Sequence, residues 1–145
     1  MATSVSSLLR QGQWISLAVQ LINLRKVFPT SVGKINSGRI QWCYDAFQAS
    51  PVSHMYRIEI EGRLGIKPAV WLSGGAINKS NIRKIPHKYD IDLDDLRVKI
   101  CLDRFDWKPY QLYVSSYIPW AMEWIIFFEI WCVTGEWSGG GIHPR

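Results

Sequence analysis

Cysteine is scarce in this 145-residue chain, and its three cysteines lie far apart. Cys43, Cys101 and Cys132 show none of the close pairing that structural metal sites and disulfide frameworks need. We therefore expect no metal, no disulfide and a reducing, cytoplasmic compartment. The chain also lacks a glycine-rich phosphate loop with its lysine, so we expect it to bind no ATP and to need no cofactor.

Long runs of one kind of residue are absent as well. The net charge is +5, but lysine and arginine never form a run of five, which makes nucleic-acid binding, with its salt-sensitive retention on DNA or RNA, the least favoured function. The most apolar stretch, residues 118–133, is shorter than the roughly 20 residues that span a bilayer, and it contains Glu123 and Glu129. A buried helix is favoured over a membrane span. Residues 1–7 do not resemble a secretory signal.

The composition instead indicates one compact domain. Apolar residues make up 48% of the chain and eight residues are tryptophan, while glycine and proline stay below the share typical of disordered chains. A chain of this length can bury roughly 68–70% of the surface that its unfolded form exposes. We therefore expect residues 1–145 to form a single domain around one core.

Hydrophobic spacing predicts a helix followed by a set of strands. Over residues 8–27, leucines recur at three- and four-residue spacing and Pro29 ends the pattern, as in an amphipathic helix. Three runs are predicted strands, namely residues 39–47, 55–62 and 69–72. In the second run, Tyr56, Ile58 and Ile60 alternate with charged residues, so one face should pack inward. The glycine and proline residues between the runs fit the turns of an antiparallel meander.

A second helix is predicted near the end of the chain. Pro119 suits its first position, and Gly135 suits the residue after its end. Its large aromatic side chains are Trp120, Trp124, Phe127, Phe128 and Trp131. Because they cover more than one stripe, we expect this helix to be buried on most of its surface.

The segment before this helix carries the residues best suited to chemistry. Cys101 follows an acid-rich run, residues 90–99, and precedes a Trp-Lys-Pro turn at residues 107–109. We expect this region to be irregular and to reach the surface, where a thiol can react. The alternative is that Cys101 is a small buried residue, since free cysteine is often buried. Cys43 lies in a predicted strand and Cys132 in the apolar helix, so both are expected in the core.

The order of these motifs resembles that of ubiquitin-conjugating enzymes. Those enzymes have a helix, an antiparallel meander, a His-Pro-Asn segment followed after one residue by Tyr, then Ile-Cys-Leu-Asp, Trp-X-Pro and a crossing helix. The matching segments here are Ile85-Pro86-His87-Lys88-Tyr89, Ile100-Cys101-Leu102-Asp103 and Trp107-Lys108-Pro109. The resemblance implies an α+β, ubiquitin-conjugating-like (UBC-like) fold in which Cys101 takes a modifier as a thioester.

Patterns near the C-terminus resemble one branch of this family more closely. They are Pro119-Trp120, Glu123-Trp124, Gly135-Glu136-Trp137 and the glycine-rich residues 139–144. All are similar to the small stand-alone conjugating enzymes of bacterial antiviral operons, the type II CBASS systems. There the partner is a cyclic-oligonucleotide synthase, a cGAS-like nucleotidyltransferase, whose C-terminus is the group transferred. The resemblance implies that such a partner is loaded on Cys101 and passed to an amine-bearing acceptor.

The resemblance also implies roles for the residues around Cys101. His87 stands where the family has asparagine, and its imidazole could stabilise an oxyanion, move a proton, or merely fix a loop. Tyr89 and Trp107 are candidates for positioning the substrate, and Trp107 also for fixing the turn. Asp103 could orient an incoming lysine or be a surface acid without a role.

Two functions from different classes therefore compete. The first is a thioester-forming acyltransferase that depends on activation elsewhere, or on an acyl donor that is already reactive. The second is a non-catalytic UBC-like module that presents a groove to a partner's C-terminal tail, and the unusual His87 motivates it. Alkylation of Cys101 in the folded protein separates them, because only the first function requires an accessible thiol.

Overall fold

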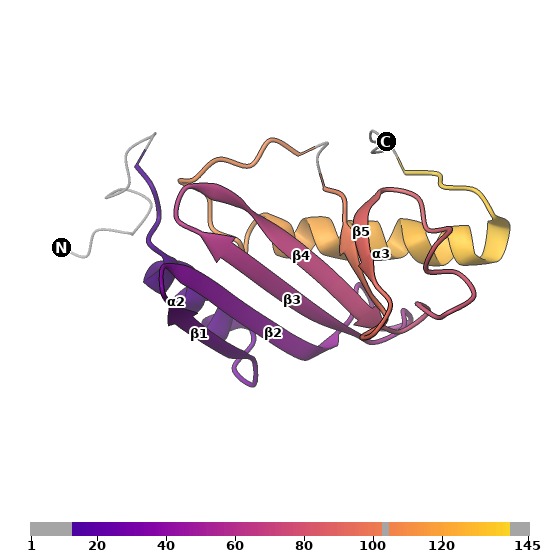
Figure 1. Cartoon of the computed structure of the whole chain (residues 1–145), viewed down its shortest axis with the longest axis horizontal. Coiled ribbons are helices and arrows are strands. Elements are labelled where there is room, and N and C mark those ends of the chain that lie inside the picture. Colours follow the sequence, from indigo (N-terminus) through magenta and orange to yellow (C-terminus); the bar gives the residue numbers. More distant parts are fainter. Residues whose placement is uncertain (1–12, 103–104, 140–145) are drawn as a thin grey trace.

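The computed structural model describes residues 13–102 and 105–139, which form an α+β structure (Figure 1). Within these ranges there are two helices and one six-stranded sheet. The elements are α2 Leu17–Val27, β1 Val32–Asn36, β2 Arg39–Phe47, β3 Tyr56–Arg63, β4 Ile66–Gly74, β5 Lys88–Asp92, β6 Arg97–Ile100 and α3 Tyr117–Thr134. The strand order is β1-β2-β3-β4-β6-β5, and every neighbouring pair is antiparallel. The α+β class predicted from the sequence is confirmed.

The central strands β2, β3 and β4 form the predicted meander. The bounds of β2 are those predicted, β3 is shifted by one residue, and β4 extends the predicted run at both ends. In β3, Tyr56, Ile58 and Ile60 are buried, and the residues between them are more exposed. The period-two pattern therefore placed the inward face of this strand correctly.

Three strands lie outside the predicted set, namely β1, β5 and β6. β5 and β6 form a hairpin from the acid-rich run, which we expected to be irregular because aspartate is disfavoured in strands. Asp92 shapes the turn of this hairpin, since its carboxylate accepts hydrogen bonds from the backbone N–H groups of Asp94 (3.1 Å) and Asp95 (3.2 Å). The acid-rich composition thus marks the tip of a hairpin.

The first helix is shorter than predicted. Residues 13–16 are not helical, and residues 8–12 lie outside the described part of the chain. Gln20 of α2 is buried and joins the helix to the segment before α3. Its side-chain nitrogen donates to the carbonyl oxygen of Gln111 (3.0 Å), and its side-chain oxygen accepts from the N–H of Tyr113 (2.7 Å). These bonds fix α2 at one end of the sheet.

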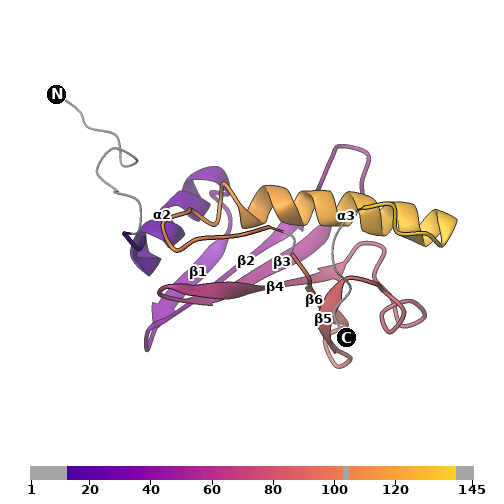
Figure 2. The ribbon, with the colours of Figure 1, turned by 90° about the horizontal axis from the view of Figure 1, so that it is seen from above.

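α3 lies along one face of the sheet (Figures 1 and 2). It begins at Tyr117, so Pro119 is its third residue and not its first as predicted. Proline is still tolerated there, because the N–H groups of the first turn have no intrahelical partner. The end of the helix is as predicted: Gly135 is left-handed, with φ of 77°, and its N–H donates to the carbonyl oxygen of Trp131 (2.8 Å).

The burial of α3 differs from the prediction that most of its surface is covered. The buried residues are Tyr117, Ile118, Ala121, Trp124, Ile125 and Phe128. Ile126, Ile130 and Val133 instead form an exposed stripe, and Val133 is 87% exposed. When apolar residues occur on all sides of a helix, its sequence does not indicate which face points to solvent. Among the residues that the structure describes, no helix is long and apolar enough to cross a membrane.

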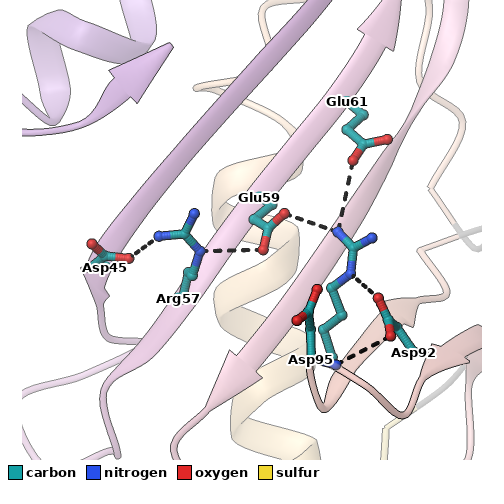
Figure 3. Close-up of polar contacts among 7 residues, drawn as sticks. Asp45, Arg57, Glu59, Glu61, Asp92 and Asp95 are labelled. Carbon is teal, nitrogen blue, oxygen red and sulfur yellow. Dashed lines mark hydrogen bonds and ion pairs between the residues drawn. The ribbon is translucent and has the colours of Figure 1, made fainter.

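A chain of ion pairs crosses the outer face of the sheet, on the side away from α3 (Figure 3). Arg97 of β6 lies at its centre, with Nε 2.9 Å from the carboxylate of Asp92 and Nη1 3.0 Å from that of Glu59. Arg57 continues the chain, since it pairs with both Glu59 and Asp45. The pairs join the hairpin of β5 and β6 to β3.

This network predicts a loss of stability in acid. The hydrogen bond from Arg97 and those from two backbone N–H groups lower the pKa of the Asp92 carboxyl group. Ionised Asp92 therefore stabilises the fold above its ordinary pKa of about 3.9, and this contribution is lost as the pH falls below that value. We expect the melting temperature of Asp92→Asn to fall less than that of the wild type between about pH 7 and about pH 3. The exposed neighbour gives the control, Asp94→Asn, which should follow the wild type; an equal fall in all three proteins would contradict the prediction.

Candidate active site

The hairpin of β5 and β6 brings the two candidate catalytic residues together. His87 precedes β5 and Cys101 follows β6, and Lys88 pairs with Ile100 where the strands meet. The N–H of Cys101 donates a hydrogen bond to the carbonyl oxygen of His87 (2.9 Å). The long stretch from Tyr89 to Cys101 therefore does not separate the backbones of His87 and Cys101, because it forms the hairpin that joins them.

The backbone of His87 has an uncommon conformation. Its φ is 53°, in the left-handed region that few residues other than glycine adopt. Two donors hold its carbonyl oxygen, the N–H of Cys101 and the indole N–H of Trp124 (3.1 Å). Residues held in such conformations cluster at functional sites, because the surrounding structure must compensate for the strain.

Lys88 holds the loop that leads into His87. Its ammonium group donates to the carbonyl oxygens of Ile85 (2.6 Å) and Arg83 (3.1 Å). Desolvation by burial lowers the pKa of this ammonium group. The loop therefore closes on itself immediately before the candidate site.

Trp137 covers the His87 side chain. The two rings lie 5.0 Å apart between centroids, at 39°. Trp137 also lies 5.4 Å from the ring of Trp124 in α3. The segment after Gly135 folds back alongside α3 and so returns to the candidate site (Figures 1 and 2). His87 is only 5% exposed, because it lies between these aromatic residues and the hairpin.

The family of the chain follows from a sequence comparison. A family model described as Type II CBASS E2 protein matches residues 20–144. The chain belongs to this family. The match includes both His87 and Cys101, and it confirms the resemblance on which the motif analysis depended. A search of curated proteins finds no match.

In this CBASS E2 protein Cys101 is more buried than expected. The residue is 8% exposed, whereas we predicted that it reaches the surface. Its neighbours Ile100 and Leu102 both belong to the hydrophobic core, and its amide is fixed to His87. The apolar residues on either side thus hold Cys101 against the core. The prediction of a surface position was wrong because it depended on the polar composition of the preceding run.

The other two cysteines are less buried than expected. We predicted both in the core, but Cys43 is partly exposed and Cys132 is exposed. Cys132 lies near the end of α3, one residue before the exposed Val133. Partial desolvation and the nearby Glu129 carboxylate raise the pKa of the Cys132 thiol, which makes it a poor nucleophile at neutral pH. Exposure alone therefore does not indicate which thiol is the better nucleophile.

The candidate substrate-positioning residues differ in exposure. Tyr89 is 43% exposed, and the ammonium group of Lys99 lies 5.5 Å from the centre of its ring. Trp107 is 4% exposed, and its indole N–H donates to the carbonyl oxygen of Gln111 (3.2 Å). Trp107 thus fixes the turn as predicted, whereas the side chain of Tyr89 is exposed at the surface. Asp103 lies outside the described residues.

Trp137 and Trp124 also belong to the candidate site of this CBASS E2 protein, although the motif analysis gave neither residue a role there. Sequence spacing placed Trp124 in a helix and showed a helix stop at Gly135, but it gave no sign that the chain returns to His87. In the structure the ring of Trp137 packs on the His87 ring, and the indole N–H of Trp124 donates to the His87 carbonyl oxygen.

Proposed function

We propose that the chain is a ubiquitin-conjugating-like acyltransferase, built as a single UBC-like domain of residues 1–145. Cys101 forms a thioester with the C-terminus of a partner protein and passes the acyl group to an amine. The hydrogen bond between the Cys101 N–H and the His87 carbonyl oxygen carries this proposal, because it joins the family's two motifs at one place. By resemblance to type II CBASS systems, the partner is a cyclic-oligonucleotide synthase.

The chemistry has two steps. In loading, the Cys101 thiolate attacks the carbonyl carbon of an activated C-terminus, a carbon–sulfur bond forms, and the leaving group departs. In transfer, an amine attacks the same carbon, and the tetrahedral intermediate collapses to an amide and releases the Cys101 thiolate. The attacking nitrogen loses a proton to a base or to water. Each step passes through an oxyanion, which a nearby donor can stabilise.

His87 is the proposed donor. A histidine N–H can bond the oxyanion as the amide of the family's asparagine does, and imidazole can also accept a proton. Trp137 packs on the ring, and two hydrogen bonds hold the backbone of His87. A donor that is fixed before the reaction needs little rearrangement in the transition state.

The direct test is mass spectrometry of the protein isolated together with its operon partners from its own cells. We expect a fraction of the chain to carry a partner's C-terminal residues at Cys101. Treatment with an excess of a small thiol should release this adduct, because thiols exchange with thioesters and leave amides intact. A chain that never carries an adduct at Cys101, even when its partners are present, would contradict the proposal.

A non-catalytic binding module is the second candidate, and the low exposure of Cys101 favours it. Alkylation with N-ethylmaleimide separates the two functions. An acyltransferase must open locally, so Cys101 should be labelled much faster than the whole protein unfolds. The partly exposed Cys43 shows in the same sample that the reagent is active. Labelling of Cys101 only at the rate of global unfolding would support the binding module.

A further inference from the structure

A pocket of about 220 Å³ adjoins Cys101. Ile100 and Leu102, the two neighbours of Cys101 in the chain, both line it. Its aromatic walls are Tyr89, Phe105 and Tyr117. A ligand in this pocket would therefore lie within one residue of the proposed nucleophile.

The charged residues that line this pocket are lysines. They are Lys67 of β4 and Lys99 of β6, and none of the lining residues that the structure describes carries a carboxylate. Among the described residues neither lysine forms an ion pair. Asp90, which pairs with Lys99 in the sheet, does not line the pocket, and its carboxylate accepts from the N–H of Ile91 (2.8 Å). The pocket thus presents positive charge to whatever enters it. We call it the lysine pocket.

The first half of β4 offers an open strand edge in the lysine pocket. β6 pairs with β4 only at Trp71, Leu72 and Ser73. Residues 67–70 line the pocket, and on this side no strand of the described chain pairs with them. Pro68, which lacks an N–H, is typical of such an edge. An extended peptide can add to an exposed edge through backbone hydrogen bonds and place its side chains in adjacent pockets.

We propose that the lysine pocket binds the C-terminal tail of the protein loaded on Cys101 and selects a tail with an acidic side chain close to its last residue. This inference rests on the proposed function. The amine acceptor is the less suitable occupant, because a protonated lysine would be repelled by Lys67 and Lys99. A carboxylate gains attraction from both lysines, while the backbone of the tail lies along β4 and its end reaches Cys101.

Peptide thioesters test this selection without the partner protein. Three peptides that end in glycine carry the neutral leaving group N-acetylcysteamine and differ only at the residue before the glycine, which is glutamate, glutamine or lysine. Cys101 attacks the thioester carbonyl, the bond to N-acetylcysteamine breaks, and that thiol leaves with the proton that Cys101 lost. Intact mass measures the acyl adduct on the full chain. We expect the glutamate peptide to load about tenfold faster than the glutamine peptide at low salt, the lysine peptide to load slowest, and the difference to shrink at high salt.

Variants show whether the lysines cause the preference. In the double variant Lys67→Gln with Lys99→Gln, the glutamate and glutamine peptides should load at equal rates. The variant Lys99→Glu should favour the lysine peptide. Lys34→Gln, on β1 at the opposite edge of the sheet, should keep the wild-type preference.

The outcomes separate this inference from the proposed function. If no peptide loads on Cys101 of the wild type, the proposed function fails. If all three peptides load at one rate, Cys101 is reactive but the lysine pocket does not select an acid. A preference that persists in the double variant would also overturn the inference, because its source would lie elsewhere.

Discussion

Replacing Cys101 by alanine is expected to abolish conjugation completely, because no other group at the site can form the thioester. Replacing it by serine should give an oxyester that forms and is cleaved more slowly and resists thiol reagents. The serine variant is therefore the better trap for the loaded state. The readout is the adduct itself, measured by intact mass before and after treatment with a small thiol.

The chain offers matched controls for this experiment. Cys132→Ala makes the same chemical change at an exposed cysteine, and Cys43→Ala makes it at a partly exposed one. Both should retain conjugation. Since Cys101 is 8% exposed, its alanine variant must also be shown to fold, by a cooperative thermal transition close to that of the wild type. A folded Cys101→Ala protein that still conjugates its partner would show that the assignment of the nucleophile is wrong.

The sequence predicted the parts of the fold where one physical signal dominates. Period-two alternation identified β3, and Gly135 identified the end of α3, because each signal is local and has one structural solution. The hairpin of β5 and β6 was missed since its aspartates disfavour strands on average. In the structure the turn uses the carboxylate of Asp92, and the strands gain from pairing with β4. Tertiary pairing thus outweighed local propensity.

Only part of the candidate site could be predicted, because sequence motifs are local whereas burial depends on residues far apart in the chain. Motif order identified Cys101 and His87, and the structure places them next to each other in the backbone. Their burial was not predictable, because it depends on the core residues beside Cys101 and on the return of Trp137 from the end of the chain. For Cys132 the prediction was wrong in the opposite direction. We expected it in the core, but it is exposed, because a residue of an apolar helix can still face solvent.

Replacing His87 by alanine is expected to slow transfer more than loading, with a loss of about 100-fold in transfer if its hydrogen bond stabilises the oxyanion. The attacking amine is a weaker nucleophile than the thiolate that attacks in loading, so transfer depends more on the oxyanion donor. His87→Asn should recover part of the rate. Asparagine tolerates the left-handed conformation that φ of 53° requires, and its amide can donate the same bond.

Single-turnover kinetics separate the roles of His87. Loading is followed with an activated acyl donor, and transfer is followed by release of the acyl group to free lysine. If the imidazole only donates a hydrogen bond, the transfer rates of His87→Asn and the wild type should depend on pH in the same way, because an amide cannot move a proton. A pH dependence present only in the wild type would assign proton transfer to His87. Equal slowing of loading and transfer in His87→Ala would instead show that the residue serves the fold.

Variants of Trp137 test, in the same kinetic experiment, whether packing of its ring positions the His87 imidazole. Trp137→Phe keeps an aromatic ring against His87, whereas Trp137→Ala removes the contact between the two rings. If packing fixes the imidazole, the alanine variant should slow transfer in the manner of His87→Ala, and the phenylalanine variant should stay close to the wild type. The alanine variant should have no further effect in a His87→Ala background, since a residue that acts only through His87 loses its influence once the imidazole is gone.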